Sequence, residues 1–133
     1  LESDAECFIV IGESLLGQRV SFSNKRVRIL RDYPNGIYFK AFDYSIQAGG
    51  YNSFHEMRAN QIPTIFYPNM STGMDDQLAR CRVSEVEGWG LVVEKRTSKS
   101  IRSSIIAVKS KEYSKLNRDT DYSATIEWVS SLL

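Results

Sequence analysis

Cysteine and histidine are scarce in this sequence of 133 residues, which contains two cysteines and a single histidine. Cys7 and Cys81 are far apart, and neither belongs to a C-x-x-C pair or lies in a histidine-rich segment. This usage argues against a disulfide-stapled scaffold and against a zinc site of the usual spacing. It favours a reduced, cytoplasmic protein whose thiols are inert and partly buried.

Excess charge and long apolar segments are also missing. The 17 basic residues nearly balance the 16 acidic ones, so the net charge is +1. We therefore do not expect a protein that coats nucleic acid or an acidic membrane. No apolar run approaches the roughly 20 residues of a membrane-spanning helix, and the N-terminus lacks the layout of a signal peptide. Because the sequence begins at Leu1 within a polar, helix-like segment, we expect a piece of a longer protein.

With 42% hydrophobic residues, the chain can build the core of one soluble globular domain. Short apolar segments of strand type alternate with helix-like ones. Strands are expected at Cys7–Gly12, Arg26–Leu30, Tyr44–Ala48, Pro63–Pro68 and Gly90–Lys95. The first of these is an uninterrupted apolar run, which is typical of a strand buried on both faces.

Helices are expected between and after these strands. They comprise a short helical turn at 37–42 and helices at 52–60, 75–88, 100–117 and 123–133. The alternation predicts an α/β, Rossmann-like domain, with a parallel sheet of about five strands and helices on both faces. In such sheets ligands bind at the carboxyl ends of the strands.

Two glycines follow the third expected strand. Gly49 and Gly50 let the chain turn abruptly into the next helix, and the absence of a Cβ allows backbone N–H groups to approach a ligand. Together with the positive end of that helix, such a turn forms an anion site of the kind that holds a diphosphate. The same glycines would also suit a tight turn that binds nothing, and the spacing leaves both interpretations open.

Ser53 and Glu56 match the S-x-x-E pattern of a capping box, in which each side chain binds the backbone N–H of the other residue. Alternatively, Glu56 accepts hydrogen bonds from ribose hydroxyls beside the diphosphate. His55, the single histidine, would have to serve any catalytic triad, yet Glu56 points another way on a helix.

Acidic residues open the helix expected at 75–88. Asp76 and Gln77 can hold neighbouring sugar hydroxyls, since a carboxylate accepts hydrogen bonds and an amide both donates and accepts. Alternatively, Asp75 and Asp76 are an N-cap and first-turn acids. A metal role for them lacks a third carboxylate or histidine at a supporting spacing. The basic run Lys95–Arg102 either touches phosphate or forms a solvated face.

Four segments, AGGYNSFHE, IPTIFYPN, DDQLARC and EGWGLVVE, follow one another in an order that resembles the C-terminal half of GT-B glycosyltransferases. The similarity covers about residues 5–95. It is to the family that contains the bacterial peptidoglycan lipid-intermediate N-acetylglucosaminyltransferase, the glycosyltransferase family 28 C-terminal domain. The resemblance implies that residues 1–133 form the donor-binding half of an inverting, metal-independent enzyme. The first strand and the N-terminal acceptor domain would then lie outside this sequence.

The resemblance also implies roles for particular residues. The donor diphosphate is assigned to Gly49, Gly50, Asn52 and Ser53, the ribose to Glu56, the donor sugar to Asp76 and Gln77, and the base to backbone near Lys40, Ala41 and Phe42. Ala48 departs from related plant and secondary-metabolite enzymes, which carry a phosphate-binding histidine there, so backbone groups and Ser53 are expected to serve instead. The catalytic base is expected on the absent half, so no catalytic residue is assigned.

The implied donor is a UDP-sugar, which is a substrate, and neither a cofactor nor a metal is expected. The implied partners are this nucleotide sugar and either the protein's own N-terminal acceptor domain or a separate acceptor subunit, through which the protein would associate with a membrane. Two other functions remain open. One is a non-catalytic binding module of the same fold, and the other is a GT-B-type UDP-N-acetylglucosamine epimerase, which should present carboxylates and a histidine to the sugar.

Overall fold

The computed structural model describes residues 9–12, 19, 21–71, 73 and 75–110. The chain divides into two compact units, residues 1–42 and 43–133, and each is described by itself. The helix expected at 123–133 and Cys7 lie outside the described residues, so the predictions for them stay predictions.

The first unit contains a two-stranded sheet. In it, β1 (Ile9–Gly12) pairs in parallel with β2 (Val27–Leu30). The expected helical turn is present as a 3-10 helix, η1 (Asn35–Ala41), which buries Phe39. The prediction that β1 would be buried on both faces is wrong, since three of its four residues are exposed. Within the described residues β1 pairs with β2 alone, so it is an edge strand of a two-stranded sheet and not the interior strand that was expected.

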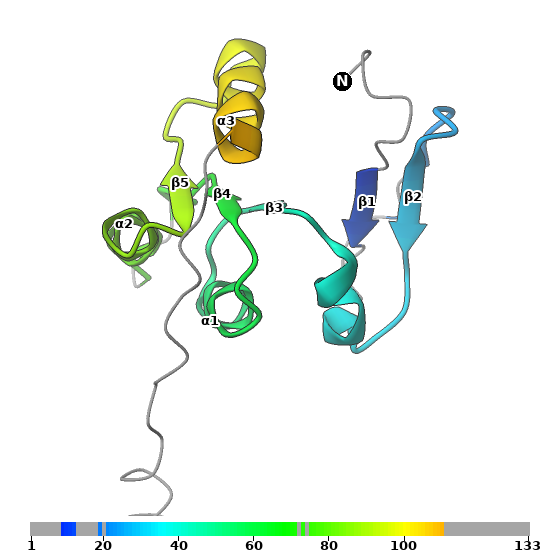
Figure 1. The fold of residues 1–133 in the computed structure, drawn as a ribbon. Helices are drawn as coiled ribbons and strands as arrows, with labels where there is room; N and C mark the ends of the chain where they lie inside the picture. The colour runs from blue at the N-terminus through cyan, green and yellow to red at the C-terminus, as the bar shows by residue number, and fades with distance from the viewer. Residues whose placement is uncertain (1–8, 13–18, 20, 72, 74, 111–133) are drawn as a thin grey trace, which may run out of the picture. The chain divides into compact units, whose positions relative to one another are not determined.

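The second unit alternates strands and helices. Their order is β3 (Ser45–Gln47), α1 (Tyr51–Ala59), β4 (Thr64–Phe66), α2 (Gln77–Val86), β5 (Gly90–Val92) and α3 (Ser98–Ser110). The three strands pair in parallel in the order β3-β4-β5. Figure 1 shows α1 and α2 on one side of this sheet and α3 on the other. Because the three strands are parallel, the segments that follow them lie at the same edge of the sheet.

The predicted α/β class with parallel strands and flanking helices is confirmed. All strand pairs in the described part of the chain are parallel, and they are divided between a two-stranded and a three-stranded sheet. The predicted end of the helix at 75–88 is also confirmed, because α2 ends at Val86 and Gly88 has a φ of 82°. That left-handed conformation is the usual glycine C-terminus of a helix.

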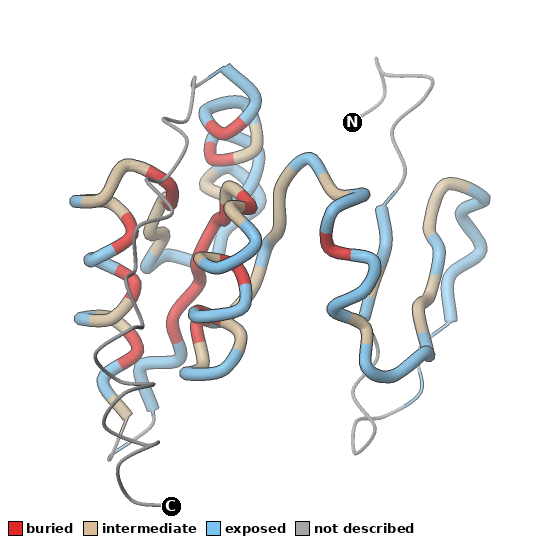
Figure 2. Tube along the Cα trace, turned by 60° about the horizontal axis from the view of Figure 1, so that its bottom comes forward, coloured by how far each residue is buried: buried red, intermediate tan, exposed pale blue. Residues whose placement is uncertain are grey.

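The core of the second unit forms on both sides of β4, whose residues are all buried. Ile65 packs toward Val108 of α3. On the other side, the ring of Phe66 lies 5.5 Å from that of Phe54 in α1 and 5.6 Å from that of Trp89, so Trp89 is a packing residue of this core. Burial of each such side chain contributes roughly 1.5–3 kcal/mol. Figure 2 shows the buried positions along this strand and on the inner sides of the helices.

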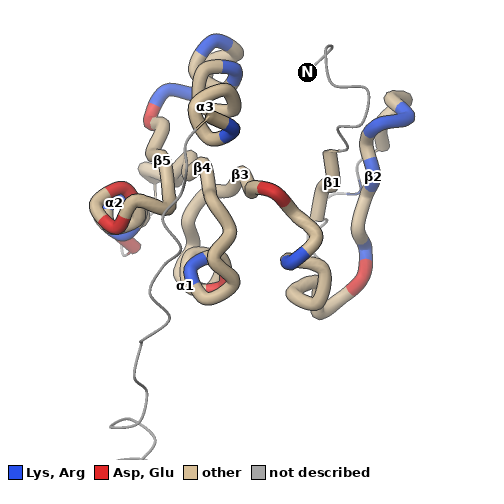
Figure 3. Tube along the Cα trace, viewed as in Figure 1, with Lys and Arg blue, Asp and Glu red and all other residues tan. Residues whose placement is uncertain are grey.

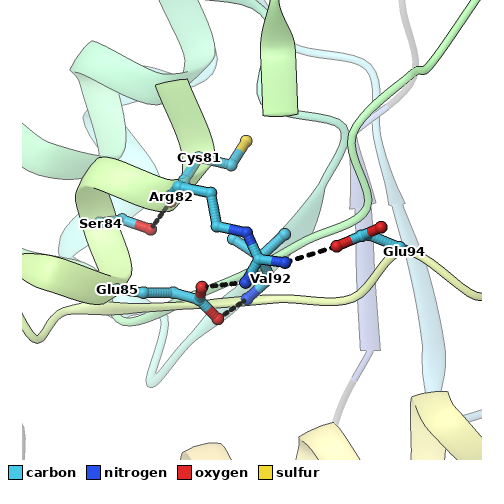
Figure 4. A network of polar contacts seen from close by, with 6 residues as sticks. All are labelled: Cys81, Arg82, Ser84, Glu85, Val92 and Glu94. Atoms are coloured by element: carbon cyan, nitrogen blue, oxygen red, sulfur yellow. Dashed lines mark hydrogen bonds and ion pairs between the residues drawn. The ribbon is translucent and has the colours of Figure 1, made fainter. Parts of the chain in front are cut away.

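A polar network joins α2 to β5 (Figure 4). Arg82 pairs with Glu85 on its own helix and with Glu94 just after β5. The Oε1 atom of Glu85 accepts a hydrogen bond from the N–H of Val92 at 2.8 Å. Because Arg82 and Glu94 are each about half exposed, their ion pair is worth at most about 1 kcal/mol. The network therefore aligns the helix with the strand more than it stabilises the fold.

Candidate functional site

Gly49 and Gly50, which connect β3 to α1, have different structural roles. Gly49 is buried with a φ of 87°, and a Cβ atom there would lie 2.2 Å from the Sγ of Cys81. Glycine is therefore required at this position by packing and by backbone conformation. Gly50 is the N-cap of α1, with no side-chain cap, and a Cβ there would meet no atom within 4 Å. The open side of the turn thus lies at Gly50, beside the first N–H groups of the helix.

The predicted capping box at Ser53 and Glu56 is wrong. Because α1 begins at Tyr51, Ser53 is its third residue and not its N-cap. A capping box occurs instead at the start of α3. There the Oγ1 of Thr97 accepts from the N–H of Ser100 at 3.1 Å, and the N–H of Thr97 donates to the Oγ of Ser100 at 3.1 Å. Capping therefore does not compete with ligand binding at Ser53 and at Glu56, which is exposed on α1.

The N-terminus of α2 borders a hollow of about 290 Å³, lined by Asn69, Met70, Gly73, Asp75, Asp76, Gln77 and Leu78. Asp76 is the N-cap, and its Oδ1 accepts from the N–H of Ala79 at 2.9 Å, which confirms the predicted N-cap. The predicted first-turn acids are wrong, because Asp75 precedes the cap and the first turn of α2 contains no acidic residue. The buried Gln77 accepts at Oε1 from the N–H of Asn69 at 3.0 Å. The structure thus places the predicted acid–amide pair at one hollow.

Arg80 connects this hollow with the glycine turn. Its Nη1 donates to the carbonyl oxygen of Gly49 at 3.1 Å. Its Nη2 donates a hydrogen bond to Asp75, which lines the hollow, and forms an ion pair with it. The guanidinium carbon lies 5.4 Å from the centre of the Tyr51 ring, within the range of a cation–π contact. The hydrogen bond between Arg80 and Asp75 lowers the pKa of the Asp75 carboxyl group and raises the pKa of the Arg80 guanidinium. Both side chains are therefore charged at neutral pH.

Sequence reasoning missed Arg80. The signal that was available is its position one helical turn after Asp76, where a basic side chain can reach back to acids at the helix start. The contact with Gly49 had no such signal, because the two residues are 31 positions apart.

Among the described residues, His55 and Cys81 do not form a catalytic pair. His55 is exposed on α1, with its ring centre 4.5 Å from that of Tyr51. Cys81 is fully buried, and burial raises the pKa of its thiol to about 11. The prediction of an inert thiol is therefore confirmed for Cys81. In the described part of the chain, no three His, Cys, Asp or Glu side chains are grouped so that they could hold a metal ion.

The remaining predicted site residues lie in both units. Asn52 is exposed at the second position of α1. Ala41 ends η1, and the N–H of Phe42, which follows it, donates to the carbonyl of Phe39 at 3.1 Å. Since Ala41 and Phe42 belong to the first unit, their role in binding the base stays a prediction.

The basic run Lys95–Arg102 surrounds the start of α3, a helix that carries Lys and Arg but no Asp or Glu (Figure 3). Arg96 donates to the carbonyl oxygens of Tyr67 and Pro68 at 3.3 and 3.4 Å, so it contacts the segment that follows β4. Most of the run is exposed, as expected for a solvated face. No helix in the described ranges has the length and apolar character needed to cross a membrane.

No protein-family model and no curated protein matches this sequence, but solved structures match the fold. The glycotransferase of kitacinnamycin matches with a TM-score of 0.64 and 16% identity, over 94% of this chain and 30% of the other. Spinosyn forosaminyltransferase SpnP matches with 0.57 and 14%, over 93% and 35%. The glycosyltransferase SnogD from Streptomyces nogalater matches with 0.56 and 17%, over 99% and 35%.

Identities this low establish similarity of fold alone. The narrower resemblance to glycosyltransferase family 28 is not confirmed by these matches. The chain spans about a third of the length of each of the three proteins, that is 30% to 35%. The parallel sheets with flanking helices therefore have the α/β fold of GT-B glycosyltransferases.

Proposed function

We propose that this chain is the domain that binds the nucleotide sugar in an inverting, metal-independent GT-B glycosyltransferase related to family 28. The observation that best supports the proposal is the junction between the glycine turn and the N-terminus of α2, made by the Arg80 bond to Gly49. Backbone N–H groups and positive potential at a helix N-terminus favour a diphosphate, and a carboxylate and an amide can hydrogen-bond to sugar hydroxyls. Groups of both kinds lie at the carboxyl edge of one parallel sheet, where such folds bind ligands.

In this proposal each part of the donor has its own set of residues. The diphosphate binds Gly49, Gly50, Asn52 and Ser53, the ribose binds Glu56, the sugar binds Asp76 and Gln77, and the base binds Ala41 and Phe42. The donor is a UDP-sugar and acts as substrate, so the proposal includes neither a cofactor nor a metal. We propose that the protein acts in the cytoplasm, because its two cysteines do not have the spacing of a disulfide framework.

The proposed reaction is a displacement at the anomeric carbon. A base on the acceptor half deprotonates an acceptor hydroxyl, whose oxygen then forms the new bond to that carbon. The bond from the carbon to the diphosphate breaks, and the diphosphate leaves with the electron pair. N–H groups at the start of α1 offset the negative charge that develops on it. The acceptor half is the protein's own N-terminal domain or a separate subunit that contacts the membrane, so the chain alone should bind donor weakly and transfer nothing.

The test is an NMR titration of this chain, and of the complete protein, with UDP, UDP-N-acetylglucosamine and GDP- and dTDP-sugars. With one nucleotide, amide shifts should be confined to Gly49, Gly50, Ser53, Glu56 and Gln77. The ribose assignment is tested by comparing the affinity for UDP with the affinity for 2′-deoxy-UDP. Glu56→Gln should reduce the preference for UDP over 2′-deoxy-UDP. The matched control Glu94→Gln should retain that preference, because Glu94 pairs with Arg82 after β5.

The alternative functions predict different results. No response to millimolar nucleotide in the chain and in the complete protein would refute the proposal and favour the non-catalytic binding module. Conversion of UDP-N-acetylglucosamine into its epimer by the complete protein, without an acceptor, would indicate the epimerase instead.

A further inference from the structure

The glycine turn has no side-chain cation of its own. Ala48 precedes it, and the N-cap Gly50 adds no side-chain hydrogen bond. A diphosphate carries several negative charges, which backbone dipoles offset only in part. In the part of the chain that the structure describes, the cation with a hydrogen bond to this turn is Arg80.

The hydrogen bond from Arg80 acts on one peptide group. The carbonyl oxygen of Gly49 and the N–H of Gly50 belong to the same planar unit, and in a trans peptide they point to opposite sides. A guanidinium that donates to the oxygen therefore polarises the N–H on the far side and makes it a stronger donor. That N–H belongs to the N-cap of α1, a residue at which an added Cβ would meet no atom within 4 Å.

Arg80 is itself held in place. Asp75 accepts from its Nη2, Tyr51 contacts its guanidinium through the ring face, and its side chain is only 19% exposed. A planar fork anchored at two points is already ordered before a ligand arrives, so little entropy is lost on binding.

We infer that Arg80 is a positioning residue for the donor diphosphate, which orients and polarises the Gly49–Gly50 peptide so that the Gly50 N–H donates to a phosphate oxygen. This inference rests on the proposed function and deepens it. Ala48 cannot bind phosphate through its side chain. In this inference Arg80 of α2 supplies a positive charge instead, and it acts on the diphosphate through the Gly49–Gly50 peptide group.

The test compares Arg80→Gln and Arg80→Lys with the matched control Arg82→Gln, which removes the same charge from the same helix but breaks only the pairs with Glu85 and Glu94. Binding of UDP and of uridine is measured by NMR titration of this chain and of the complete protein. We expect Arg80→Gln to weaken UDP binding about tenfold and to leave uridine binding unchanged. Arg80→Lys should recover part of the loss, because lysine keeps the charge but not the two-armed fork.

The free proteins provide a second readout. The Gly50 amide proton should shift in Arg80→Gln and not in Arg82→Gln, while the indole N–H resonance of Trp89, which reports on the core, stays in place in both. UDP binding by Arg80→Gln at the wild-type affinity, or equal losses for UDP and uridine, would overturn this inference alone. Absence of UDP binding by the wild-type complete protein would overturn the proposed function as well.

Discussion

Gly49 lies against Cys81 so closely that a Cβ atom at Gly49 would be 2.2 Å from the Cys81 Sγ. The turn at the end of β3 is thus seated on the buried face of α2. The same helix sends Arg80 to the carbonyl of Gly49. The position of the proposed anion site therefore depends on α2, which contributes a buried contact below the turn and a charged contact beside it.

Gly49→Ala should lower the free energy of unfolding by about 3 kcal/mol, because it overpacks the core and places a Cβ on a left-handed residue. Gly50→Ala should cost less than about 1 kcal/mol, since there is open space at Gly50. Urea denaturation measures both. Cys81→Ala in the Gly49→Ala background should restore part of the loss, and equal losses at the two glycines would contradict the assigned roles.

Asp76 can be tested separately as a cap and as a ligand. Asp76→Ala should destabilise the protein by about 1 kcal/mol through loss of the cap, whereas Asp76→Asn should be nearly neutral, because asparagine caps as well as aspartate. If Asp76 also holds the sugar, Asp76→Asn should weaken UDP-sugar binding more than UDP binding. Both affinities are measured by titration. If Asp76→Asn weakens the binding of UDP and of UDP-sugar equally, Asp76 acts only as the helix cap.

The two candidate capping boxes predict opposite results. Thr97→Ala should cost about 1 kcal/mol, because it removes the bond to the Ser100 N–H. Ser53→Ala should change stability by less than about 0.5 kcal/mol, since Ser53 is inside α1 and alanine is a good helix former. Thermal and urea unfolding of the two variants make the comparison. A larger loss for Ser53→Ala would restore the capping role to Ser53.

Cys81 should resist alkylation by iodoacetamide at pH 8 in the folded protein and react once the protein is unfolded. Burial raises the pKa of the folded thiol from its ordinary value of 9.0 to about 11. The contribution of this group to stability is therefore fully present below pH 9 and is lost as the pH rises toward 11, because the unfolded thiol ionises first. Cys81→Ala should remove that part of the pH dependence, and rapid alkylation at pH 8 would disprove the burial.

Much of the fold could be predicted because the elements depend on local pattern. The apolar run between Pro63 and Pro68 becomes the buried β4, and Gly88 ends α2 in the left-handed conformation that glycine adopts most easily. The expected burial of β1 was wrong, because burial depends on neighbouring strands that no local pattern specifies.

The candidate site was predictable where chain order and sheet topology suffice. Parallel strands bring the segments after β3 and β4 to one edge, so the glycine turn and the pair Asp76 and Gln77 were expected near each other. The S-x-x-E match at Ser53 misled, because the start of α1 is set by the turn at Gly49 and Gly50, which packs on α2.

The sequence by itself determined which residues can form strands, turns and helix ends, because those choices depend on neighbours in the chain. Tertiary structure alone decided that Arg80 would reach Gly49 across 31 positions and that Cys81 would occupy the space beside it. The physical reason is that both contacts require β3, α1 and α2 to be packed together, and packing selects among side chains that a local pattern treats alike.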